Sequence, residues 1–191
     1  MVLTTQERPT ARQRLLTAAD ELFYEEGLHA VGIDRVIERA GVAKATLYNT
    51  FGSKEELIKA YLEGRDTQRR ERITGKLSRY TEPRERLLGL FDILGETIAM
   101  PSFRGCAFLR ASTESAEGDA VTQVCDAYRG WLHRLLVDLA TEAGAREPEA
   151  LAAKLAVLYD GVMTGAQMDK NLSSAATARS IAQVLVDAAV E

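Results

Sequence analysis

The stretch GVAKATLYNTFGSKEEL, residues 41–57, decides the fold of this chain because it contains a helix end, a turn and a complete short helix. Gly41 closes the preceding apolar pattern at the position where a helix commonly ends in a left-handed residue. After a tight turn, residues 44–51 place Leu47 and Phe51 at i and i+4, so that both face a core. The other side chains of this segment are mostly polar and remain available for hydrogen bonding.

The segment before Gly41, residues 33–40, carries the apolar pattern of another helix. Two helices joined by a short, glycine-containing turn form a helix-turn-helix, whose second helix enters the major groove of DNA. The pattern alone also allows an ordinary turn between two core helices. Ser53 and Glu56 match the S-x-x-E capping box and predict a new helix from Lys54, where the first turn and the ammonium group could hold a phosphate.

Apolar periodicity predicts helices along the whole chain, without an alternating strand-like run or an internal repeat. Thr10 and Gln13 match a capping box, which starts a helix that Gly27 ends. Pro148 stands where proline suits the first turn of a helix. The chain is therefore expected to be all-α with about nine helices. Their expected ranges are 10–26, 33–40, 44–51, 54–80, 84–99, 105–115, 119–143, 149–169 and 174–190.

The composition, with 46% hydrophobic and 27% charged residues in 191, is that of a soluble globular protein. No run approaches the roughly 18 apolar residues of a membrane span, and the N-terminus MVLTTQERPTARQR lacks the apolar core of a signal peptide. A cytoplasmic protein with no membrane segment is therefore expected. Two cysteines and two histidines are too few for a disulfide framework or a metal cluster, so no metal and no cofactor is expected.

The net charge of -4 argues weakly against a nucleic-acid partner, because affinity for DNA comes largely from Lys and Arg that neutralise phosphates. Their distribution matters more than the total. Cations around the helix-turn-helix segment can gather on one face: Arg8, Arg12, Arg14, Lys44 and Lys54. Six more cations lie in the predicted helix 54–80 and are interpreted as a solvated surface: Arg65, Arg69, Arg70, Arg72, Lys76 and Arg79.

The stretch 41–57 resembles the recognition-helix signature of the TetR/AcrR family of transcriptional regulators, and the resemblance extends upstream through RQRLLTAADELFYEEGLHAVGIDRVIERA. It implies an N-terminal three-helix DNA-binding head over residues 1–55. It also implies a C-terminal helical domain for ligand binding and dimerisation over residues 56–191. The sequence departs from the family pattern at VGID, where Gly32 replaces the usual hydroxyl N-cap; such a glycine costs only a few tenths of a kcal/mol.

The resemblance also indicates which side chains contact DNA. Tyr48 matches the characteristic tyrosine of the family, whose hydroxyl usually reaches the DNA backbone. Lys44 can pair with a phosphate or donate to a guanine edge, and Asn49 can read adenine or contact a phosphate. The full predicted DNA-binding set is Arg35, Lys44, Thr46, Tyr48, Asn49, Thr50 and Lys54.

A regulator of this family is expected to act on double-stranded operator DNA as a homodimer, because one helix-turn-helix reads only a few base pairs of a palindromic site. The last two helices are the expected dimer surface. The most usual mode is repression, relieved when a small molecule enters the C-terminal helices. Taken singly, an apolar or aromatic residue of this set is more often core than pocket. The predicted ligand-binding residues are Phe91, Phe103, Cys106, Arg110, Tyr128, Trp131, Tyr159 and Met163.

Two alternatives to this function remain from the sequence. The motif RGC at 104–106 resembles one found in some family members that sense electrophiles or oxidants, so Cys106 is a candidate thiol switch as well as a packing residue. A helical adaptor that no longer binds DNA is a second alternative. An enzyme is not expected, since His29 and His133 are isolated and have no nucleophile partner.

Overall fold

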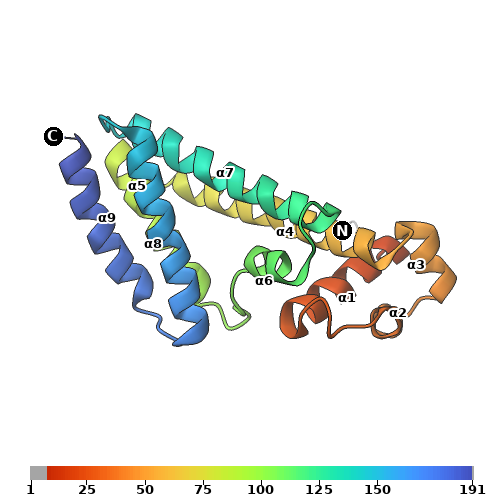
Figure 1. The fold of residues 1–191 in the computed structure, drawn as a ribbon. Helices are drawn as coiled ribbons and strands as arrows, with labels where there is room; N and C mark the ends of the chain where they lie inside the picture. Colours follow the sequence, from red (N-terminus) through yellow and green to blue (C-terminus); the bar gives the residue numbers. More distant parts are fainter. Residues whose placement is uncertain (1–7, 191) are drawn as a thin grey trace, which may run out of the picture. The chain divides into compact units, whose positions relative to one another are not determined.

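The computed structural model describes residues 8–190, and every regular element within that range is an α-helix (Figure 1). The all-α prediction is therefore confirmed. The domain ranges 1–55 and 56–191 include residues 1–7 and 191, which lie outside the described residues. The helices are α1 (Ala11–Glu26), α2 (Ile33–Ala40), α3 (Lys44–Phe51), α4 (Lys54–Leu77), α5 (Pro83–Ile98), α6 (Ala107–Glu114), α7 (Ala120–Glu142), α8 (Pro148–Met168) and α9 (Ser174–Val190).

Local signals in the sequence set several of these boundaries. The Thr10 hydroxyl accepts a hydrogen bond from the backbone N–H of Gln13, and the Gln13 side chain accepts one from the N–H of Thr10, which completes the predicted capping box. Gly41 ends α2 in the left-handed conformation, with φ 61° and ψ 45°. The Ser53 hydroxyl accepts a hydrogen bond from the N–H of Glu56 at the start of α4. These predictions are confirmed.

One compact unit comprises residues 8–65 and Ala107–Cys125. Its core joins α1, α3 and the first half of α4 through fully buried leucines and an edge-to-face contact between Phe23 and Tyr61, whose ring centroids are 5.6 Å apart. This unit extends past residue 55 into α4 and takes in α6. The boundary at 55/56 itself stays a prediction.

The second compact unit comprises residues 66–106 and 126–190. Within it α5 is buried over most of its length and lies beside α8 and α9 (Figure 1). The buried face of α9 consists largely of Ala175, Ala178 and Ala182, small residues that allow close helix packing. Ion pairs of Arg84 with Asp187, and of Arg179 with acidic residues of α5, add polar links between α5 and α9.

Candidate nucleic-acid interface and effector region

Helix α3 is anchored by one buried side chain and presents its other face to solvent. Leu47 is fully buried, whereas the neighbouring Tyr48 is 46% exposed and Asn49 is exposed as well. Phe51, expected in the core, is only half-buried, and the guanidinium of Arg12 lies 5.4 Å from the centre of its ring. Tyr48 and Asn49 can therefore contact a partner while the buried Leu47 holds α3 in place.

The two predicted threonine contacts are less available than Tyr48. Thr46 and Thr50 are both half-buried. The Thr50 hydroxyl donates a hydrogen bond of 2.6 Å to the backbone carbonyl of Thr46, which occupies its proton within the helix. Its oxygen remains an acceptor, so a contact with DNA phosphate from Thr50 would require the hydroxyl to turn.

Lys44 and Arg35 are held by acidic neighbours in the head. The Lys44 ammonium lies 3.0 Å from the Asp34 carboxylate, and this hydrogen bond raises the pKa of Lys44. The Arg35 guanidinium makes a bidentate hydrogen bond to the Glu26 carboxylate, and this contact lowers the pKa of Glu26. Solvent screening makes exposed pairs of this kind weak. A DNA phosphate can therefore compete for both cations.

Lys54 has a structural partner that the sequence did not indicate. Its ammonium donates a hydrogen bond of 2.8 Å to the backbone carbonyl of Leu28, in the turn between α1 and α2. Arg14 plays a comparable part at the end of α2, because its guanidinium donates to the carbonyls of Ala40 and Gly41. Both cations thus link helices of the head to one another.

A polar cluster in the second unit brings together three of the predicted ligand-binding residues. The hydroxyls of Tyr128 and Tyr159 lie 3.2 Å apart. The guanidinium of Arg69 donates to the Tyr128 hydroxyl at 3.0 Å and lies 3.9 Å from the Cys106 sulfur. Burial raises the pKa of Tyr128 well above its ordinary value, so its hydroxyl stays un-ionised near neutral pH. Trp131 lies beside Tyr128, with ring centroids 6.3 Å apart.

Arg69 is the residue of this cluster that sequence reasoning missed. The cations of residues 65–79 were interpreted as a solvated surface, and for Arg69 this interpretation is wrong, because its guanidinium is bonded to the buried Tyr128. The apolar periodicity of α4 nevertheless contained a sign that Arg69 faces the core. Leu62, Arg69 and Ile73 are spaced i, i+7 and i+11, which places Arg69 on the apolar stripe of α4.

The remaining ligand-binding candidates are dispersed. Phe91 and Met163 are buried in the second unit, and Phe103 is half-buried there. Arg110 belongs to the first unit, where it donates to the backbone carbonyl of Tyr24 at 2.8 Å. Within residues 8–190 no three His, Cys, Asp or Glu side chains come together as a metal site. The described helices also include none that is long and apolar enough to cross a membrane.

The helix-turn-helix arrangement is that of DNA-binding regulators, and comparison with known proteins agrees with it. Residues 15–61 match the family model described as bacterial regulatory proteins, tetR family. The transcriptional activator FasR of Mycolicibacterium smegmatis is 40% identical over 80 residues, which cover 42% of this chain and 36% of FasR. The regulator BetI of Rhizobium meliloti is 26% identical over 155 residues, 81% of this chain and 76% of BetI. The chain spans less than half the length of the first curated relatives it matches.

Solved structures extend the similarity over nearly the whole chain. SCO4454, a TetR-family transcriptional regulator from Streptomyces coelicolor, superimposes with a TM-score of 0.89 at 30% identity, covering 95% of this chain and 96% of that one. The reduced form of NemR from E. coli has the same fold, with a TM-score of 0.80 at 21% identity and coverage of 92% and 97%. The chain belongs to the TetR family of transcriptional regulators.

Proposed function

We propose that this protein is a ligand-responsive regulator that occupies a palindromic operator and releases it when a small molecule binds the C-terminal helices. The observation that carries the proposal is the geometry of α3, where buried Leu47 fixes a helix whose exposed side offers Lys44, Tyr48 and Asn49. In a helix-turn-helix this side faces the major groove and its phosphates. Arg35, Thr46, Thr50 and Lys54 complete the proposed DNA contacts.

The proposed assembly is a homodimer formed through α8 and α9. Positions 157, 161, 164 and 168 of α8 are spaced as one helical stripe, and all four are exposed. Positions 177, 181, 184 and 188 make an exposed stripe on α9 in the same way. Valines, Ile181 and Met168 make these stripes partly apolar, and exposed apolar surface of this kind marks an interaction site. A two-fold dimer would place two heads over successive major grooves, roughly 34–36 Å apart.

The proposed effector site is centred on Tyr128 and Tyr159. Their hydroxyls, the Arg69 guanidinium and the nearby Trp131 ring combine hydrogen-bonding groups with aromatic surface, as ligand sites do. The proposed lining further includes Phe91, Phe103, Cys106 and Met163 of the same unit, whereas Arg110 belongs to the other unit and is not part of this site. Release of operator by a ligand requires that the ligand bind the DNA-free state more tightly than the DNA-bound state.

The first test is titration of the purified protein against DNA fragments that flank its own gene, at 50 and 200 mM salt. A regulator that neutralises several phosphates should lose roughly 10³-fold in affinity between these salt concentrations. One fragment should also bind far more tightly than the others. A reporter driven by that fragment then distinguishes repression from activation, which matters because FasR is named an activator. Equal, weak binding to every fragment would contradict the proposal and favour a helical adaptor.

A second candidate function, sensing of electrophiles by Cys106, is supported by the position of its sulfur. The sulfur is half-buried, lies near the Arg69 cation, and directly precedes α6 in the chain. The thiolate is the form of cysteine that reacts with electrophiles. With a maleimide, the thiolate would form a carbon–sulfur bond as the carbon–carbon double bond is lost, and the adjacent carbon would take up a proton from water.

We expect N-ethylmaleimide to weaken operator binding of the wild-type protein and to leave binding by Cys106→Ser unchanged. The matched control is Cys125→Ser, because Cys125 is buried and its thiol donates to the carbonyl of Phe108. This control should keep the response to the reagent. Mass spectrometry of the labelled protein identifies the modified cysteine, and full operator affinity after complete labelling of Cys106 would contradict thiol sensing.

A further inference from the structure

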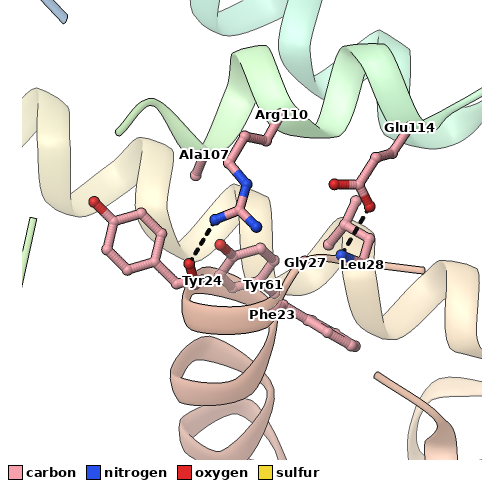
Figure 2. Close-up of a pocket in the computed structure, with 8 residues that line it drawn as sticks. All are labelled: Phe23, Tyr24, Gly27, Leu28, Tyr61, Ala107, Arg110 and Glu114. Atoms are coloured by element: carbon pink, nitrogen blue, oxygen red, sulfur yellow. Dashed lines mark hydrogen bonds between the residues drawn. The ribbon is translucent and has the colours of Figure 1, made fainter. Parts of the chain in front are cut away.

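Two side chains of α6 take up the hydrogen bonds that would otherwise continue α1. The last helical turn of α1 includes the bond from the N–H of Gly27 to the carbonyl of Phe23. The next bond would join the N–H of Leu28 to the carbonyl of Tyr24. Instead, the Leu28 N–H donates to the Glu114 carboxylate at 2.9 Å, and the Tyr24 carbonyl accepts from the Arg110 guanidinium at 2.8 Å. Figure 2 shows both bonds on either side of Gly27.

Arg110 and Glu114 each lie next to backbone groups whose partial charge is opposite to their own. The carbonyl end of a helix carries a partial negative charge, and Arg110 lies at that end of α1. Glu114 accepts a second backbone N–H, that of His29, at 3.0 Å. The His29 ring nitrogen Nε2 in turn donates to the backbone carbonyl of Glu114 at 2.5 Å. The turn after α1 is therefore attached to α6 at several points.

Gly27 allows this close approach. Its φ is +102°, a conformation that side-chain-bearing residues rarely adopt. A Cβ atom there would lie 3.1 Å from a guanidinium nitrogen of Arg110 and 3.3 Å from a carboxylate oxygen of Glu114. We call Gly27, Arg110 and Glu114 the α6 clamp.

The turn held by the α6 clamp sets the direction of the helices that follow. Leu28 and Val31 are buried in the core of the head, and the Leu28 carbonyl receives the ammonium of Lys54 at the start of α4. Helix α2 begins at Ile33, and its N-cap residue Gly32 makes no side-chain hydrogen bond. The helix follows directly on the turn held by the α6 clamp.

We propose that Arg110 and Glu114 are positioning residues for DNA binding, which fix the turn between α1 and α2 and so hold the helix-turn-helix in the geometry that fits the operator. The inference rests on the proposed DNA-binding function. Neither residue is proposed to contact DNA. Their effect reaches α3 through Leu28, the start of α2 and the helix-turn-helix core.

Amide hydrogen exchange tests the clamp without DNA. In Glu114→Ala, the amides of Leu28 and His29 should exchange about 10- to 100-fold faster than in the wild type, since each loses a bond to a charged acceptor. Glu114→Gln retains an oxygen acceptor of similar shape, so its amide exchange rates should lie between those of the wild type and Glu114→Ala. The control is Glu117→Ala, an exposed carboxylate just beyond α6, which should leave both amides as they are. Unchanged exchange in Glu114→Ala would overturn the clamp.

Operator affinity, measured on the same variants, tests the positioning role. Glu114→Ala and Arg110→Gln should lower affinity for the bound fragment roughly 10-fold or more, with partial recovery in Glu114→Gln and circular dichroism unchanged. If the amides of Leu28 and His29 exchange fast in Glu114→Ala but operator affinity is unchanged, the proposed positioning role is wrong. If the wild type binds no fragment, the proposed function fails, whereas the exchange result still decides the clamp. If Glu114→Ala does not fold, Glu114→Gln and Arg110→Gln provide the same comparison.

Discussion

Replacement of Val157 and Val184 by glutamate is expected to make the protein monomeric and to lower operator affinity by about 100-fold or more. These side chains are 70% and 67% exposed and lie on the outward stripes of α8 and α9. Because they do not pack inside the protomer, their replacement should leave its core unchanged. In a two-fold dimer each substitution occurs twice in one interface, so four carboxylates would be brought together and desolvated.

The loss of affinity follows from the number of heads that bind one DNA molecule. A dimer places two heads on one operator, and each contributes its own phosphate and base contacts. A monomer retains one set, and its affinity falls toward the non-specific range of about 10⁻⁴ to 10⁻⁶ M. Sedimentation equilibrium gives the mass of the variant, and a titration with operator DNA gives its affinity.

A matched control separates the dimer surface from exposed apolar residues in general. Leu109, on α6, is 51% exposed but belongs to the first unit rather than to α8 or α9. Leu109→Glu should remain a dimer and should keep its affinity. A monomeric Leu109→Glu, or a dimeric double variant of Val157 and Val184, would show that the dimer forms through another surface.

Tyr48→Ala is expected to lower operator affinity by about 10²- to 10⁴-fold, and Lys44→Ala to lower it less while reducing its dependence on salt. A hydrogen bond to a charged group contributes about 1.5–3 kcal/mol, and Tyr48 would make one to a phosphate in each head. Loss of Lys44 removes one phosphate contact per head, so the slope of log affinity against log salt should fall by about 2 in the dimer. Fluorescence anisotropy at several salt concentrations measures both effects.

The structure supplies controls for these two variants. Tyr48→Phe keeps the ring and removes only the hydroxyl, so it should reproduce most of the loss if the phosphate bond is responsible. Arg134→Ala removes an exposed cation of α7 and reports the effect of net charge alone. Both recognition-helix variants should keep the wild-type melting temperature and dimer mass, because Leu47 anchors α3. Unchanged operator binding in Tyr48→Ala and Lys44→Ala would refute the assignment of α3 as the DNA-contacting helix.

Helix boundaries were predictable because they depend on residues close in the sequence. Thr10 with Gln13, Ser53 with Glu56, and Gly41 each satisfy or terminate backbone groups within one turn of the chain, and the structure contains all three. The apolar period likewise gave an all-α chain, because it repeats within each helix.

Partners distant in the sequence were not predictable in this way. Arg69 meets Tyr128 across 59 positions, and Arg110 meets Tyr24 across 86. Helical periodicity shows which residues share a face, but it does not show which other helix covers that face. The sequence pattern therefore predicts a surface cation at Arg69 and groups Arg110 with residues of the other compact unit.

The close packing of α9 on α5 also affects the energetics of assembly. The alanines on the inner face of α9 have no side-chain rotamers to order. Ion pairs of Asp187 with Arg84 and of Arg179 with Glu85 join α9 to α5. The outward stripe of α9 is consequently held in place before any second copy arrives. Association then loses little conformational entropy, which is one of the main free-energy costs of forming an interface. The proposed dimer would therefore form at a smaller entropic cost than one built on a loosely packed helix.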